Sequence, residues 1–338
     1  MAQSAGRALR ELGVEVDLVA TDSPETGGYD VAHVFGIFHP QTAARQIDAV
    51  RKGGTPLVLS PIWLDLRPYF ATAPLVERAL RGRTPGAVER RLETMRKRLR
   101  EPRARDKAAR RADREIELQR ELVHQADVLL PASEVEAYRY GEQLRVASVP
   151  YAVAPVGTDE EALTIERAGE RAGVLCVGRV ESKKNQAALL YALRDVDVDV
   201  TIVGREYDAP YSALCRRWAT PRTRFAGTPS RAEVLAMMAR AAVHAYPAWV
   251  EIPGLASIEA AAAGARAVSG DRGCEREYLG PEADYADPSE PESIRTAVLR
   301  ALGRGPRERD DPLEQRLRGR TWRAHAEATL AAYRRVLR

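Results

Sequence analysis

Two series of short apolar segments, each separated by helical patterns, constrain the fold of this chain more than any other feature. The first series includes residues 30–35 and 55–60, with a helical pattern over 41–52 between them. The second series begins near Gly173 and has four apparent strands, over 174–177, 198–203, 243–246 and 265–269. Short strands that alternate with helices predict an α/β fold with parallel, doubly wound sheets. We therefore expect two Rossmann-like domains that face one another across a cleft.

The first domain begins in an unusual place. Residues 3–12 show a helical pattern that ends at Gly13, and residues 14–20 then alternate like a strand. A doubly wound domain usually opens with a strand and a glycine-rich turn. We therefore expect that about fifteen residues, one strand and one turn, are missing from the front of the chain.

The basic character of the chain is local. Of the 338 residues, whose net charge is +4, residues 81–120 contain fifteen Lys and Arg against seven Asp and Glu, a local charge of +8. Residues 86–125 predict one or two long charged helices that are too polar to form core. The surface 81–120 either is a solvated helical face or makes peripheral contact with an anionic membrane or a phosphorylated acceptor. We expect no nucleic-acid partner.

Composition and short motifs exclude several classes of protein. The chain has no apolar run of eighteen residues and no signal-peptide core, which favours a cytoplasmic location. A peripheral contact with the membrane would then be at the inner face of the membrane. The three cysteines, Cys176, Cys215 and Cys274, are far apart and form no CxxC pair, so neither disulfides nor a zinc site are predicted. A G-x-S-x-G elbow, an HExxH helix and a P-loop are all absent from the sequence.

Candidate binding residues follow the strands of the second series, where ligands bind in open parallel sheets. Gly178 and Arg179 come directly after the segment 174–177, and Lys184 follows five residues later. An arginine can hold a diphosphate through two hydrogen bonds, and a nearby lysine adds a point charge. Together the two cations could stabilise a departing nucleoside diphosphate. Basic residues in a surface loop are the alternative.

A second group of candidates lies after the segment 243–246. Glu251 is in the predicted loop, Gly254 precedes a strong helix-forming run over 257–263, and Glu259 lies about one turn inside that helix. Free N–H groups at Gly254, Leu255 and Ala256 would then point at an anion. The two carboxylates could accept hydrogen bonds from hydroxyl-rich groups, although glutamate is also common in the first turn of any helix.

Weaker candidates lie elsewhere. The loop around Phe225 and Gly227 could place backbone groups against a planar base. In the first domain, His33 and His39 flank the end of the segment 30–35 and are candidates for the acceptor or sugar side of the cleft.

In order and spacing these residues resemble the retaining glycosyltransferases of the GT-B fold, specifically glycosyltransferase family 4, also known as glycosyl transferases group 1. Gly178-Arg179 followed by Lys184 looks like the phosphate-binding segment of that family, and Phe225-Ala-Gly227 is similar to its FxG loop. Glu251 and Glu259 reproduce its E-x7-E spacing. The resemblance implies an N-terminal acceptor domain over 1–153, a nucleotide-sugar-binding domain over 154–318 and a final helix over 319–338 that packs back on the first domain.

The resemblance also implies an activity and a role for each residue. Glu259 would hold the donor ribose, while Glu251 and the amides at Gly254 and Leu255 would hold the sugar and the distal phosphate. Arg179 and Lys184 would neutralise the departing diphosphate. The chain would move a sugar, a hexose, from a nucleotide sugar to a hydroxyl of a glycan, lipid-linked or small-molecule acceptor, and would need no metal and no other cofactor.

Departures from the family concentrate in the first domain. The family's glycine-rich loop is absent, and Ile62 stands where many members carry a histidine. An alternative is therefore a catalytically impaired protein that binds the donor and acts as a partner or scaffold. The sequence leaves open the donor base and sugar, the acceptor and the oligomeric state.

Overall fold

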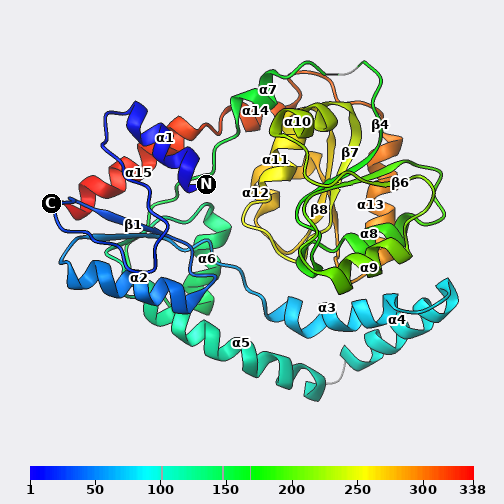
Figure 1. Cartoon of the computed structure of the whole chain (residues 1–338), viewed down its shortest axis with the longest axis horizontal. Helices are drawn as coiled ribbons and strands as arrows, with labels where there is room; N and C mark the ends of the chain where they lie inside the picture. Colours follow the sequence, from blue (N-terminus) through cyan, green and yellow to red (C-terminus); the bar gives the residue numbers. More distant parts are fainter. Residues whose placement is uncertain (100–101, 147, 168) are drawn as a thin grey trace. The chain divides into compact units, whose positions relative to one another are not determined.

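The computed structural model in Figure 1 describes residues 1–99, 102–146, 148–167 and 169–338, with side chains described outside 99–112. The chain divides into two compact units. Unit 1 comprises Met1–Leu64, Arg111–Gly157 and Gly319–Arg338, and unit 2 comprises Asp65–Arg110 and Thr158–Arg318. The residues 65–110 thus group with unit 2, although the boundaries drawn from the sequence place them in the first domain.

Unit 1 contains a three-stranded parallel sheet in the order β1-β2-β3. Its strands are β1 (Ala32–Phe35), β2 (Leu57–Ser60) and β3 (Val128–Leu129), and its helices are α1 (Ala2–Glu11), α2 (Pro40–Lys52), the last part of α5 (Pro102–Val123), α6 (Glu134–Gln143) and α15 (Trp322–Val336). The register pairs Ala32 with Leu57 and Phe35 with Ser60. Strands β1 and β2 and helix α2 lie where the apolar pattern predicts them.

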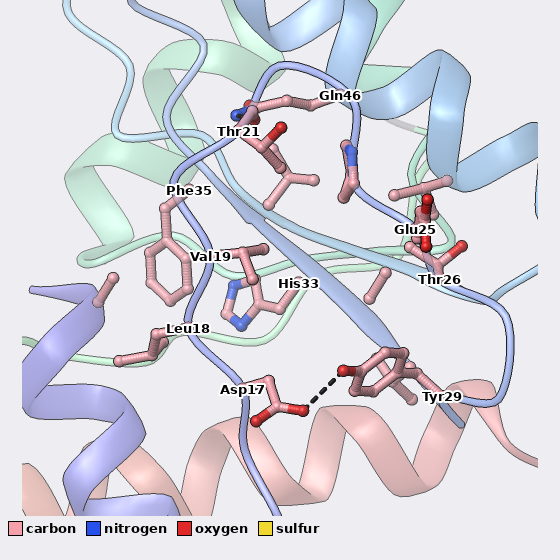
Figure 2. Close-up of a pocket in the computed structure, with 16 residues that line it drawn as sticks. Asp17, Leu18, Val19, Thr21, Glu25, Thr26, Tyr29, His33, Phe35 and Gln46 are labelled. Carbon is pink, nitrogen blue, oxygen red and sulfur yellow. Dashed lines mark hydrogen bonds between the residues drawn. The ribbon is translucent and has the colours of Figure 1, made fainter.

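The strand expected over residues 14–20 is absent, although these residues belong to the described part of the chain. The segment is extended, but Leu18 and Val19 are 45% and 69% exposed. Asp17, Leu18 and Val19 of this segment line a cavity of about 240 Å³ together with residues of β1 (Figure 2). An alternating pattern fixes which side chains share a face, whereas a strand also needs a neighbour to pair with.

The last helix, α15, packs within unit 1. Ala326 of α15 is buried in one cluster with Ala8 and Leu9 of α1. A Cβ added to Gly157 would lie 2.3 Å from the backbone nitrogen of Trp322, so the chain passes close to the start of α15 at a point where only glycine fits.

Unit 2 contains a six-stranded, fully parallel sheet in the order β6-β5-β4-β7-β8-β9. The strands are β4 (Ala172–Val177), β5 (Val200–Val203), β6 (Thr223–Phe225), β7 (Ala241–Tyr246), β8 (Arg266–Gly270) and β9 (Asp284–Ala286). The chain therefore builds one half of the sheet outward from β4 and the other half outward from β7. This is the doubly wound order that the sequence predicts, and its switch point lies between β4 and β7.

Helices cover both faces of this sheet (Figure 1). They are α7 (Glu160–Thr164), α8 (Gln186–Leu193), α9 (Ala209–Arg217), α10 (Arg231–Arg240), α11 (Leu255–Ala262), α12 (Glu275–Leu279), α13 (Pro291–Gly303) and α14 (Pro312–Arg318), with short 3-10 turns η1 (Ser182–Lys184) and η2 (Gly280–Glu282). Every residue of α8 is buried, as expected of a helix that is apolar on all sides.

Two further helices of unit 2, α3 (Arg67–Leu80) and α4 (Pro85–Leu99), join the same core. Val88, Leu92 and Met95 of α4 recur at helical spacing, and they are buried in the main hydrophobic cluster. The expectation that this charged stretch is too polar for the core was wrong, because its narrow apolar stripe is sufficient to anchor it.

The predicted basic surface 81–120 falls partly on residues 99–112, whose side chains lie outside the described part. Among those described, Arg96 pairs with Glu290, and Lys97 pairs with Glu93 at 2.9 Å. No helix within the described residues combines the length and the apolar content that crossing a bilayer requires.

Candidate functional site

The predicted residues Gly178, Lys184 and Glu251 lie on the two loops that leave the switch point of the unit 2 sheet. Strands β4 and β7 are parallel neighbours, so their carboxyl ends lie at one edge. Gly178 follows β4 directly, and Tyr246 is the last residue of β7. In doubly wound sheets ligands bind in the crevice outside this point.

Glycines make this edge tightly packed. A Cβ added to Gly178 would lie 2.8 Å from the Tyr246 ring, and one added to Gly204, after β5, would lie 2.0 Å from the carbonyl oxygen of Gly178. Contacts this short exclude any side chain. The loops after β4, β5 and β7 can therefore approach one another only because glycine occupies these two positions.

Lys184 and Glu251 form an ion pair that joins the loops after β4 and β7. Their side chains are 16% and 14% exposed, so solvent screens the pair only weakly. The Tyr246 hydroxyl donates a hydrogen bond to Glu251 Oε1 at 3.2 Å, and Lys184 Nζ lies 5.5 Å from the centre of the Tyr246 ring. Burial and the nearby Glu251 carboxylate raise the pKa of Tyr246 well above its ordinary value, so the hydroxyl remains a donor.

Arg179 lies in the same loop but is bound differently. Its guanidinium pairs with Glu181 at 3.1 Å and lies over the Tyr207 ring, 5.3 Å from the ring centre. The side chain is 54% exposed. Arg179 is thus held near the carboxyl ends of β4 and β5 with its guanidinium accessible to an anion.

The amino terminus of α11 lies beside Glu251. Gly254 is the N-cap, and a Cβ added there would be 3.7 Å from Cγ of Glu251. The amides of Leu255 and Ala256 are in the first turn and have no acceptor within the helix. Behind the loop, the N–H of Cys274 donates to the carbonyl oxygen of Glu251 at 3.3 Å. The carboxylate and the helix amides are therefore presented together.

Glu259 lies one turn further along α11 and is held by Arg231 of α10. Arg231 Nη1 donates to Glu259 Oε1 at 3.1 Å, and the same guanidinium binds the carboxylates of Asp159 and Glu161. Burial raises the pKa of Glu259, and the Arg231 cation opposes that rise. The Glu259 side chain is 17% exposed, and its pairing with Arg231 fixes the orientation of the carboxylate.

The third predicted loop is built mainly through its backbone. The Phe225 ring packs against the main hydrophobic cluster, under the guanidinium of Arg216 at 4.5 Å. Gly227 has a φ of 67°, and its carbonyl oxygen accepts the N–H of Gly204 at 2.7 Å. The conformation of Gly227 favours glycine and ties this loop to the one after β5.

The two predicted acceptor-side histidines belong to unit 1. His33 Nδ1 and Nε2 lie 2.9 Å from the Tyr333 hydroxyl and 2.9 Å from Ser60 Oγ. Burial lowers the pKa of His33 to about 3, so the ring is neutral at ordinary pH. It lines the cavity beside β1 (Figure 2), together with the Asp17–Tyr29 hydrogen bond. His39 is exposed and precedes α2, with its ring 4.9 Å from that of Phe38.

Two residues of the site were not predicted as such. Tyr246 could have been found, because it ends a predicted strand and strand ends supply ligand contacts. Arg231 lies in a helix, 28 residues before its partner Glu259, and no spacing signal links the two. Within the described residues no cluster of three or more His, Cys, Asp or Glu side chains is arranged to hold a metal ion.

Comparisons with known proteins agree with this geometry. Residues 159–316 match the model of the family Glycosyl transferases group 1, a range that contains every residue predicted to bind the donor. No curated protein matches the chain.

Among solved structures, the chain is similar to sucrose-phosphate synthase from Thermosynechococcus elongatus, with a TM-score of 0.64 and 16% identity over 91% of this chain and 74% of that one. It is also similar to the UDP-forming α,α-trehalose-phosphate synthase from Burkholderia xenovorans in complex with glucose-6-phosphate, with a TM-score of 0.58 and 14% identity over 100% and 77% of the two chains. Anabaena HepE in complex with UDP gives a TM-score of 0.54 and 14% identity over 90% and 74%. The predicted fold is confirmed: the chain has the GT-B fold of two Rossmann-like domains, and the match to the family Glycosyl transferases group 1 falls on the second of them.

Proposed function

We propose that the chain is a retaining glycosyltransferase of family 4 that transfers a hexose from a nucleotide sugar to a hydroxyl of an acceptor. The observation that carries this proposal is the Lys184–Glu251 ion pair at the switch point between β4 and β7. It places one cation and one hydroxyl-binding carboxylate beside the amino terminus of α11. A diphosphate and a sugar require these two kinds of group side by side.

The donor would bind along the carboxyl ends of the unit 2 strands. Glu259 accepts hydrogen bonds from the ribose hydroxyls, and the amides of Leu255 and Ala256 donate to the distal phosphate. Lys184 exchanges the Glu251 carboxylate for the diphosphate. Glu251, still bound by the Tyr246 hydroxyl, is then free to accept from hydroxyls of the sugar.

In the reaction, the bond between the anomeric carbon and the diphosphate oxygen breaks, and its electron pair moves to the diphosphate. Lys184 and Arg179 stabilise that charge as it develops. The acceptor oxygen forms the new bond on the same face of the sugar, and its proton passes to the departing phosphate oxygen. The configuration at the anomeric carbon is therefore retained, which is the outcome that the family resemblance implies.

The neighbouring structures include one named as UDP-forming and one in complex with UDP, which makes UDP and UDP-sugars the first probes to use. We propose a hydroxyl acceptor that is a glycan, a lipid-linked sugar or a small molecule.

The test is a panel of UDP-, GDP-, ADP- and dTDP-hexoses, with binding measured by calorimetry and slow donor hydrolysis measured by release of the nucleoside diphosphate. We expect one base to be preferred and Glu259→Ala to weaken its binding by at least tenfold. The matched control is Glu327→Ala, which removes an exposed carboxylate of α15. The absence of binding and hydrolysis with every donor would refute the proposal. Binding without hydrolysis or transfer would instead support a donor-binding scaffold.

A further inference from the structure

Helix α3 reaches the turn that carries Lys184, although it comes from the first third of the sequence. The Tyr69 hydroxyl donates to Ser182 Oγ at 2.9 Å, and Ser182 Oγ donates in turn to a carboxylate oxygen of Glu77. Ser182 is the first residue of η1, and Lys184 is the last. The serine hydroxyl therefore uses both its acceptor and its donor capacity on one helix, which fixes its rotamer and the start of the turn.

Tyr69 also touches the second loop of the site. Its ring meets that of Trp249 edge to face, with the ring centres 6.3 Å apart. Trp249 is 1% exposed and lies two residues before Glu251, and its backbone N–H donates to the carbonyl oxygen of Lys183 at 2.9 Å. One tyrosine of α3 is thus in contact with both segments that form the Lys184–Glu251 pair.

The other anchors of the η1 turn come from the sheet side. Asn185, which has a φ of 62°, donates through its side-chain amide to the carbonyl oxygens of Pro247 at 3.1 Å and Pro288 at 2.8 Å. A three-residue 3-10 turn has too few internal hydrogen bonds to hold its own position. Two adjacent lysines, Lys183 and Lys184, also repel one another within it. Asn185 thus anchors the end of the turn, and the contacts from α3 anchor its start at Ser182.

We infer that Tyr69 and Glu77 are positioning residues for the donor diphosphate, acting through Ser182 on Lys184, an inference that rests on the proposed function. They touch neither the sugar nor the phosphates. Their effect is to hold the Lys184 ammonium at the distance at which it can bind the diphosphate, and a displacement of about 1 Å in such a group is enough to lower the rate about a hundredfold. Tyr69 and Glu77, which lie outside the matched range 159–316, thereby support the proposed donor site.

The test compares a nucleoside diphosphate with its own monophosphate. The diphosphate that binds the wild-type chain most tightly among UDP, GDP, ADP and dTDP is used, together with the corresponding monophosphate, and both Kd values are measured by calorimetry. Tyr69→Phe, Glu77→Gln and Ser182→Ala are each expected to raise the Kd of the diphosphate by about three- to tenfold. The Kd of the monophosphate, which does not need Lys184, is expected to stay within twofold.

A double-variant cycle tests whether Glu77 acts through Ser182. In a chain that already carries Ser182→Ala, adding Glu77→Gln is expected to change the diphosphate Kd by less than twofold, because the hydrogen bond that links the two is already gone. Independent, multiplicative losses would overturn the proposed route through the serine.

The control is Tyr191→Phe. Tyr191 of α8 donates to Glu89 of α4 at 2.5 Å. This variant therefore removes a tyrosine–glutamate hydrogen bond at the helix that follows α3, away from the η1 turn. It is expected to lower Tm and to leave the ratio of the two Kd values unchanged. Equal loss of diphosphate and monophosphate binding in the α3 variants would show a purely structural role and overturn the inference, as would unchanged binding. If the wild-type chain binds none of the nucleotides, the proposed function itself fails.

Discussion

Lys184 and Glu251 are 67 positions apart in the sequence, yet their side chains form one ion pair where the loops after β4 and β7 meet. An ion pair this poorly exposed is costly to leave half-made, because the remaining charge loses both water and its partner. Each side chain of the pair therefore holds the other in place. In the proposed function, the diphosphate of the donor is the anion that takes the place of Glu251.

Lys184→Ala is predicted to lower kcat/KM for the donor by about a hundred- to a thousandfold, because it removes a charge aimed at the developing diphosphate. It also leaves the Glu251 carboxylate unpaired, so Tm should fall. The measurement is steady-state donor hydrolysis beside a thermal melt. Lys52→Ala, which breaks an exposed pair with Asp48, should leave both quantities unchanged. A kcat/KM within twofold of wild type for Lys184→Ala would contradict the assigned role.

Donor affinity is predicted to fall as the pH is lowered, and the fall should begin at a higher pH than it would if Glu259 had the pKa of an ordinary glutamate. Burial raises the pKa of Glu259, and only its ionised form accepts hydrogen bonds from two ribose hydroxyls. Affinity is therefore present above the folded-state pKa and lost as the pH falls through it. Arg231→Gln removes the cation that opposes this rise, so the midpoint should move to still higher pH. The Kd of the preferred nucleoside diphosphate is measured across the acid range in both proteins, and a midpoint that stays or moves down would contradict the prediction.

The strands of unit 2, and the loops on which the proposed donor residues lie, could be predicted because local patterns determine them. Apolar runs marked the strands, and in a parallel sheet the residues after each strand share one edge, which brings Lys184 and Glu251 together. The two predictions that were wrong, on residues 14–20 and on the charged helices, concern contacts with residues that are distant in sequence. Residues 14–20 alternate correctly but have no neighbour to pair with, and the apolar stripe around Leu92 predicts a buried face without saying which core receives it.

The same limit explains the missed side chains. The pairing of Arg231 with Glu259 depends on how α10 packs beside α11, and the contact of Tyr69 with Ser182 depends on where α3 docks. Neither relation leaves a spacing in the sequence, because each joins residues whose separation along the chain is arbitrary.

Donor turnover is predicted to survive removal of divalent metal. Arg179 and Lys184 supply two positive charges, and the first-turn amides of α11 supply aligned donors, which is the neutralisation that a diphosphate leaving group needs. The chain is treated with excess EDTA, desalted into metal-free buffer and assayed for donor hydrolysis. We expect a rate within twofold of the untreated protein. Loss of activity that Mg²⁺ or Mn²⁺ restores would show that these groups are insufficient and would redirect attention to the carboxylates of the site.

Leu92→Ala is predicted to destabilise unit 2 by about 2–5 kcal/mol, because Leu92 is 1% exposed within the main hydrophobic cluster and its removal leaves a cavity. If α4 were only a solvated basic helix, as its composition suggests, this substitution would have no effect. Urea unfolding measures the difference. The matched control is Glu93→Ala on the next residue, whose side chain is exposed and pairs with Lys97 one turn away. Equal free energies of unfolding for the two variants would show that α4 does not pack on unit 2. A large effect confined to Leu92→Ala would show that residues 85–99 pack in the core of unit 2. Helix α3, which precedes them, would then be a fixed support for the η1 turn that carries Lys184.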